Sequence, residues 1–175
     1  MEHLSYPIGR YEEQAYSDKQ RDEWIRDIEF LPGDLEYAIT NLDAEQLNTP
    51  YRDGGWTVRQ LVHHVADSHM NAYIRFKVGL TEENPTIKPY DENKWAELHD
   101  VQKLPVNISV TILHAVHARL YETLKYVTDD DWNNKTVFHP EHKKTMRLWF
   151  LLGMYAWHGK HHVAHITSLR ERKGW

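Results

Sequence analysis

The chain has 175 residues, of which 41% are hydrophobic and 27% are charged, the makeup of one ordinary globular domain over residues 1–175. Lysine and arginine number 21 and aspartate and glutamate 26, so the formal net charge of −5 has the wrong sign for a nucleic-acid partner. The mean hydropathy is −0.73, and no apolar stretch approaches the roughly 20 residues of a membrane span. We therefore expect no membrane partner.

Cysteine and histidine have the most informative counts. The absence of cysteine excludes disulfides, thiolate metal ligands and a cysteine nucleophile, and it suits a cytoplasmic protein. The amino terminus also lacks the pattern of a secretory signal. The 13 histidines are far more than an average soluble protein carries. Because the chain has no cysteine, we expect any metal site to use nitrogen and oxygen ligands.

The first two long helices are predicted by caps and apolar spacing. Ser17 and Gln20 have capping-box spacing, and apolar residues recur every three or four positions from Trp24 to Leu42. Pro32-Gly33 should kink or split this helix. A second capping box at Thr57 and Gln60 begins a helix to about Leu80. Residues 85–105 then form a long connection with a short helical piece around Trp95.

A third helix is predicted by apolar residues at steps of four, which are Ile108, Ile112, Val116, Leu120, Leu124 and Val127. It should stop before Thr128, and the acidic run 129–131 then begins a helix or forms a solvated loop. Residues 136–139, followed by Pro140, indicate a short extended piece and a turn. Thr145 is placed to cap a last helix toward Arg172.

These elements predict an all-α fold. We expect a four-helix bundle with a long link between the second and third helices and a short irregular or hairpin segment before the fourth. The long links leave room for a crossover topology. The core of such a bundle is the natural place for a metal.

Histidines cluster on two of the predicted helices. The second helix carries His63, His64 and His69, and the fourth carries His158, His161, His162 and His165. At about 100° per residue, His158 and His162 lie some 40° apart on one face, which is the spacing for two imidazoles to grip one ion. That face continues the apolar stripe of Leu151 and Tyr155, so it should point inward.

Spacing alone leaves alternatives open. His161 and His165 are also four residues apart, and His63 adjoins His64. The apolar stripe brackets His64 more closely, which favours it over His63. Neutral imidazole suits zinc, nickel or iron, and a third ligand from the facing helix would complete an open site.

At this point a family resemblance becomes visible. The chain resembles the YfiT-like branch of the DinB superfamily over essentially its whole length. The resemblance rests on residues 49–69 (TPYRDGGWTVRQLVHHVADSH), residues 157–166 (WHGKHHVAHI), the opening LSYPIG and the closing Gly174-Trp175. The family fold is a four-helix bundle that holds a divalent metal by three histidines, and such proteins resemble homodimers.

The resemblance implies a specific ligand set. The histidine before an apolar-alanine pair is His64, and the closing motif gives His158 and His162. His63, His161 and His165 remain alternates. His165 is an extra candidate because Val163-Ala164-His165 stands where much of the superfamily has an Arg-Gly-Gln-like tripeptide.

Three protein ligands leave a coordination position open for chemistry. A metal there lowers the pKa of water to about 7 or binds a thiol as its thiolate. The resemblance implies either a metal-dependent hydrolase or a transferase that uses a small thiol such as bacillithiol or mycothiol. We expect a thiol S-transferase acting on a small-molecule substrate with zinc or nickel. The alternatives are a hydrolase and a non-catalytic, metal-binding stress-response bundle.

Four further residues have two possible roles each. Asp67 is a weak candidate for a catalytic base, and more often such a carboxylate orients a ligating histidine. Gln60 should cap the helix rather than contact ligand. Arg75 should form a surface salt bridge rather than meet a cosubstrate carboxylate. Trp56 should be core rather than a substrate platform.

Overall fold

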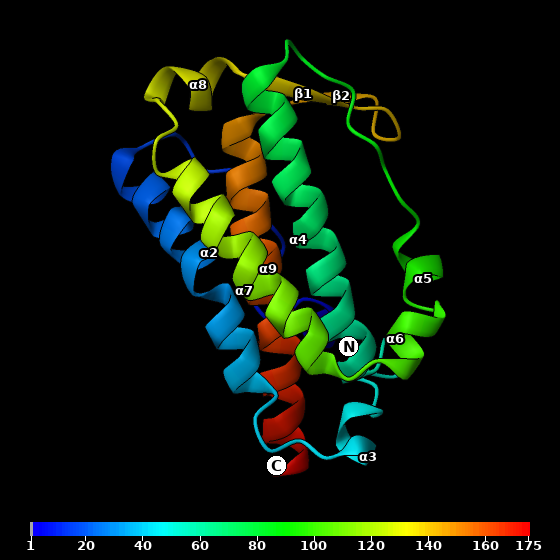
Figure 1. Cartoon of the computed structure of the whole chain (residues 1–175). Coiled ribbons are helices and arrows are strands. Elements are labelled where there is room, and N and C mark those ends of the chain that lie inside the picture. The colour runs from blue at the N-terminus through cyan, green and yellow to red at the C-terminus, as the bar shows by residue number, and fades with distance from the viewer. Residues whose placement is uncertain (1) are drawn as a thin grey trace.

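Four long helices form the body of the protein in a computed structural model that describes residues 2–175. They are α2 (Asp18–Ala38), α4 (Val58–Thr81), α7 (Val106–Leu124) and α9 (Leu148–Lys173). In Figure 1, α4 and α7 run upward while α2 and α9 run downward. Both α2 and α4 pack against α7 and α9, so α2 and α4 lie diagonally across the bundle. The predicted all-α four-helix bundle is confirmed.

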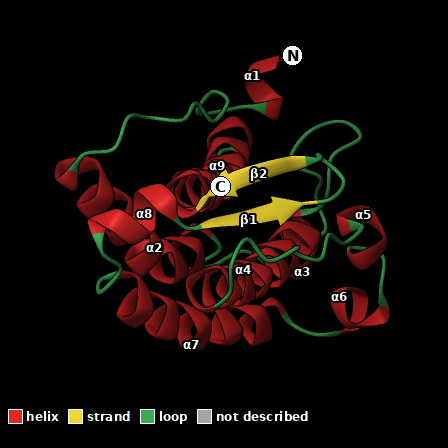
Figure 2. Cartoon of the chain, turned by 90° about the horizontal axis from the view of Figure 1, so that it is seen from above, coloured by secondary structure: helices red, strands yellow, loops and turns green. Residues whose placement is uncertain are grey.

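Short elements fill the connections. They are α1 (Glu2–Ser5), α3 (Ala44–Leu47), α5 (Glu92–Trp95), α6 (His99–Lys103), α8 (Asp129–Asn134), β1 (Thr136–His139) and β2 (Lys144–Arg147). The strands pair antiparallel as a hairpin, which lies across one end of the bundle in Figure 2. The long link after α4, the helical piece at Trp95 and the segment before α9 are as predicted. The acidic run begins a helix, α8.

Two details of the predicted helices are wrong, the end of α2 and the cap of α9. α2 ends at Ala38, so Leu42 lies outside it. Of the two outcomes expected at Pro32, a kink or a split, the split does not occur because the helix continues through this residue. Thr145 does not cap α9 because it pairs with Phe138 in the hairpin, and the helix begins at Leu148.

The buried face of α7 also differs from the predicted stripe. Its buried residues are Ser109, Val110, Leu113, His117, Leu120 and Leu124. Of the predicted stripe, Ile108 is 42% exposed, and Ile112 and Val116 are only partly buried. The prediction considered apolar residues alone and therefore did not include His117, which is buried.

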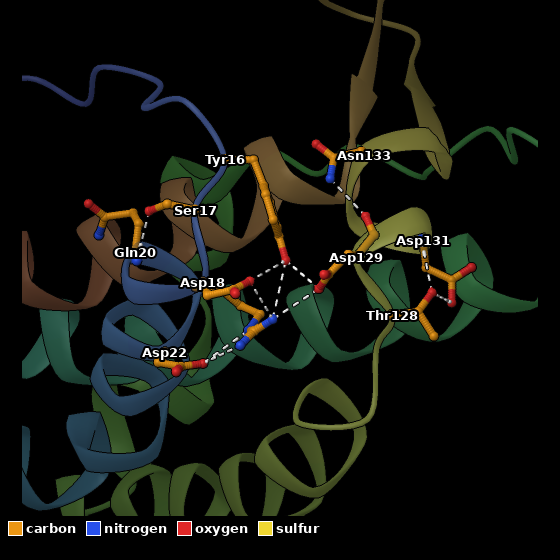
Figure 3. A network of polar contacts seen from close by, with 10 residues as sticks. Tyr16, Ser17, Asp18, Gln20, Asp22, Thr128, Asp129, Asp131 and Asn133 are labelled. Atoms are coloured by element: carbon orange, nitrogen blue, oxygen red, sulfur yellow. Dashed lines mark hydrogen bonds and ion pairs between the residues drawn. The ribbon is translucent and has the colours of Figure 1, made fainter.

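A polar network joins α8 to the start of α2. Ser17 caps α2, as predicted, by accepting from the backbone N–H of Gln20, but the Gln20 side chain donates to Glu23 and does not complete the capping box. Thr128 caps α8 by accepting from the backbone N–H of Asp131. Arg21 donates to Asp129 at 2.9 Å, and the Tyr16 hydroxyl donates to the same carboxylate, as Figure 3 shows. These contacts hold the start of α8, the helix that leads into the hairpin, against the start of α2.

A layer of histidines divides the apolar core in two. One apolar cluster includes Ile28, Ala72 and Leu120, and the other includes Leu31, Ala66, Leu113 and Ile166. His69, His117 and His158 fall between these positions on α4, α7 and α9. The middle of the bundle is therefore polar.

None of the helices in the described chain combines the length and apolarity needed to cross a bilayer. Several large apolar side chains are exposed, among them Phe30, Tyr37 and Tyr126. The expected homodimer stays a prediction.

Candidate metal centre

Three histidines from two helices converge at the middle of the bundle. The Nε2 atom of His158 lies 3.2 Å from Nε2 of His64 and 3.1 Å from Nε2 of His162. One ring nitrogen from each residue lies within 4.8 Å of the others. His64 and His162 are buried, and His158 is partly buried. The structure thus brings together the three residues that the sequence selected.

The His158 ring is oriented by a chain of hydrogen bonds that passes through all four long helices. Nδ1 of His158 lies 3.3 Å from Nε2 of His69 on α4. Nδ1 of His69 lies 3.0 Å from Nε2 of His117 on α7. Nδ1 of His117 contacts the backbone carbonyl of Ile28 on α2.

Pro32 explains why that carbonyl is available. In a helix, the carbonyl of Ile28 would accept from the N–H of residue 32, and proline has no N–H. The side chain of His117 supplies the missing donor. The proline thus leaves an unpaired carbonyl inside the core, and a histidine on the neighbouring helix α7 donates to it.

The acceptor at one end of the chain sets every tautomer along it. A carbonyl only accepts, so Nδ1 of His117 carries the proton and Nε2 of this neutral ring accepts from Nδ1 of His69. Nε2 of His69 then accepts from Nδ1 of His158. Burial lowers the pKa of His117 to about 4 and that of His69 well below its usual range, so both rings are neutral at pH 7. His158 therefore presents an Nε2 lone pair to His64 and His162.

The donor set fits a divalent cation. Burial lowers the pKa of His64 to about 4 and, together with neighbouring histidines, holds those of His158 and His162 well below the usual range. The three imidazoles are neutral at pH 7 and do not compete with protons for a metal. One lone pair on His158 faces two other nitrogens, and a single cation would satisfy all three.

A second group of histidines adjoins the first. Nε2 of His161 and Nε2 of His165 are 3.0 Å apart, and His162 completes this group. Burial, followed by the charges of His161, Arg52 and Arg172, lowers the pKa of His165 to about 3. Two arginines near His165 disfavour a dication there.

All five of these histidines line one surface depression of about 350 Å³. Aromatic rings enclose it: Trp157 stacks on His161 at 4.5 Å, Trp56 lies 4.5 Å from His64, and Tyr51 lies 4.0 Å from His165, all between ring centroids. Volumes of this order suit a small molecule. The first group of histidines is therefore reachable from outside.

The family can now be identified. The sequence matches the DinB superfamily over residues 27–166. The chain belongs to the DinB superfamily. Relatives from Bacillus cereus strain B4264 and Bacillus thuringiensis subsp. konkukian are each 54% identical over 176 residues, with full coverage of both chains, and are named putative metal-dependent hydrolases. The solved structure of YfiT from Bacillus subtilis superposes with a TM-score of 0.95 at 48% identity, covering 99% of both chains. That protein is described as "a probable metal-dependent hydrolase with an unusual four-helix bundle topology".

The other candidate residues of this DinB superfamily protein can now be compared with the roles expected of them. Gln60 caps α4 in a complete capping box with Thr57, as expected. Trp56 is not core, because it is only partly buried and lines the depression. The buried ring of His63 bonds Ser109 at 2.7 Å through Nδ1 and does not join either group.

Arg75 and Asp67 lie apart from the three histidines. In the described chain Arg75 forms no salt bridge, which corrects the prediction, and it donates to the Tyr155 hydroxyl at 2.7 Å and the Lys88 carbonyl at 3.1 Å. Burial and the charge of Asp100 raise the pKa of Asp67 to about 6. The Asp67 carboxylate neither lines the depression nor bonds a ligand histidine there. His69 has taken the orienting role that we expected of it.

Three residues of this site were not found in the sequence. His117 could have been found, since it lies four residues after Leu113 and three before Leu120. Arg52 comes from the turn before α4 and Glu92 from the short helix α5, and both line the depression only through tertiary structure.

The neutral histidine layer predicts that acid destabilises the protein. His117 has a pKa of about 4 when folded and about 6.5 when unfolded. The unfolded chain therefore binds more protons between these values, so the free energy of unfolding is greatest above pH 6.5 and falls toward pH 4. This group alone accounts for up to roughly 3 kcal/mol.

Urea unfolding of EDTA-treated protein at several pH values measures this effect. We expect His117→Phe to flatten the dependence. His99→Gln, an exposed site on α6, should leave it unchanged. A constant urea midpoint between pH 7.5 and 5 would contradict the neutral assignment.

Proposed function

We propose that this protein is a metal-dependent enzyme that activates a small nucleophile at His64, His158 and His162. The observation that carries the proposal is the convergence of three neutral imidazoles, one of them locked with its lone pair facing the other two. The names of the relatives support metal dependence. Zinc and nickel are the cations that best suit such a donor set.

A bound dication would supply Lewis-acid chemistry, lowering the pKa of a thiol or water that occupies its open position. The protein supplies the rest. His69 and His117 hold the His158 ring, and the depression with its aromatic rings admits a small molecule beside the histidines.

The leading candidate reaction is thiol S-transfer. The sulfur of a small thiol such as bacillithiol attacks an electrophilic carbon, a carbon–sulfur bond forms, and the leaving group departs with its electron pair. The thiol proton goes to a base or to solvent. The thiol must come from outside because the chain has no cysteine. A coordinated thiol loses its proton readily, so the absence of Asp67 from the depression is no obstacle.

Hydrolysis is the second candidate, favoured by the names of the relatives and by Glu92. This is the one carboxylate among the described residues that line the depression. Its side chain is exposed, yet partial desolvation by its surroundings, followed by the charge of Asp91, raises its pKa, which suits a group that takes a proton from water.

Metal analysis of histidine variants tests the ligand set. We expect protein purified without a tag to hold one divalent cation per chain. His64→Ala, His158→Ala and His162→Ala should each remove it, because two imidazoles grip an ion much more weakly than three. His161→Ala should retain it.

Thermal denaturation of the same variants shows whether each of them folds. Loss of metal from a folded His161→Ala, with retention in His64→Ala, would assign the ion to the second group instead.

Activity assays separate the two reactions. We expect the zinc- or nickel-loaded protein to transfer a thiol to a chlorinated electrophile and to leave esters intact when no thiol is present. Glu92→Gln should lower a hydrolytic rate by about 10²-fold or more and have little effect on thiol transfer. Ester turnover without thiol, lost in Glu92→Gln, would instead establish the hydrolase. Firm metal binding with neither activity in broad screens would favour the non-catalytic bundle.

A further inference from the structure

The depression that exposes the three histidines also contains an arginine that has no counter-ion among the described residues. Arg52 lies in the turn between α3 and α4 and lines the same depression as the histidines. Its one hydrogen bond runs from Nη1 to the carbonyl of Asp53 at 3.0 Å. Nε is buried without a partner, and no carboxylate in the described chain pairs with this guanidinium. A buried donor without a partner is costly unless something binds to it.

The turn holds Arg52 in place. The backbone N–H groups of Tyr51 and Gly55 bond to the carbonyls of Trp56 and Arg52, both at 3.0 Å. A Cβ on Gly55 would lie 2.9 Å from Cγ of Arg52, so the arginine stem packs directly on this glycine. The guanidinium carbon lies 5.3 Å from the centroid of the Tyr51 ring. The cation is therefore positioned before any ligand arrives.

Other groups near Arg52 determine the charge on this side of the depression. The His161 and His165 rings are neutral at pH 7 and bonded to each other. Arg172 donates to the carbonyl of Tyr51 at 2.6 Å and adds a second positive charge nearby. Glu92 is the only acidic residue of the described chain that lines the depression.

Arg75 makes an instructive contrast. The Nε atom of Arg75 is also buried without a partner, but both of its terminal nitrogens donate, one to the Tyr155 hydroxyl and one to the Lys88 carbonyl. It lines a separate depression of about 460 Å³ that includes only His158 of the three histidines. Arg52 shares its depression with all three.

From this arrangement we propose that the small molecule bound at the histidines carries a carboxylate or phosphate group that Arg52 binds. The inference rests on the proposed function and adds a substrate class to it. Guanidinium binds both kinds of oxyanion through paired N–H donors. The reactive atom would lie at the three histidines while the anionic group lies at the arginine.

Two thiols of matched size test the inference. Cobalt(II)-loaded full-length protein is titrated with 3-mercaptopropionate and with the neutral 3-mercapto-1-propanol, and binding is followed by cobalt absorption. We expect the charged thiol to bind at least about tenfold more tightly, the range of a charge-assisted hydrogen bond. Arg52→Gln should reduce this preference to less than twofold without changing the affinity for the neutral thiol. Arg26→Gln, an exposed arginine on α2, is the matched control.

A second arm does not depend on thiol chemistry. Propionate and inorganic phosphate are added separately to the purified full-length protein, and the Nε–H resonance of Arg52, assigned with Arg52→Gln, is followed by NMR. A saturable shift with one anion supports the inference and identifies the kind of oxyanion. The resonance of Arg26 should not move.

The two arms separate the possible failures. If neither thiol binds cobalt but the Arg52 resonance shifts, the thiol reaction fails and the anion site stands. If both thiols bind equally in the wild type, or if Arg52→Gln keeps the preference, the anion site is overturned while the thiol reaction stands. A resonance that moves with neither anion also overturns it.

Discussion

The hydrogen bond between His117 and the carbonyl of Ile28 is the contact on which the candidate site depends. Pro32 leaves this carbonyl without its helical partner, and the carbonyl can only accept. It thereby fixes the proton of His117, and the same constraint passes through His69 to His158. A property of the α2 backbone thus determines which nitrogen of a ring on α9 is free to bind a metal.

The bundle topology makes this chain of contacts possible. Because α2 and α4 lie diagonally and both contact α7 and α9, one side chain or carbonyl from each long helix meets in the middle layer. Buried imidazoles are costly when their nitrogens lack partners. Here each inner ring uses both nitrogens, so the polar layer is satisfied and orients the ligand ring at the same time. Such contacts behind a ligand are the usual means of holding it in register.

Much of this arrangement could be predicted from local sequence patterns. The capping residues Ser17 and Thr57 mark helix starts because they satisfy backbone N–H groups within one turn. The spacing of His158 and His162 is equally local. His117 was missed because an apolar stripe phased on Ile108 and Ile112 assigns it to the wrong face. Arg52 and Glu92 could not be placed, since their positions depend on how the turn before α4 and the short helix α5 lie relative to α9. The sequence places Pro32 within a predicted helix, so the unpaired carbonyl of Ile28 could be foreseen. The sequence does not show that the His117 side chain faces this carbonyl.

A carbonyl of α2 sets the tautomers of three histidines. Long-range proton–nitrogen NMR of histidine-labelled, metal-free protein at pH 7.5 reports the protonation of each ring nitrogen. We predict protonated Nδ1 and unprotonated Nε2 in His117, His69 and His158. The His117→Phe substitution should release His69 and His158 into mixed tautomers. A proton on Nε2 of His158 in the wild-type protein would contradict the account.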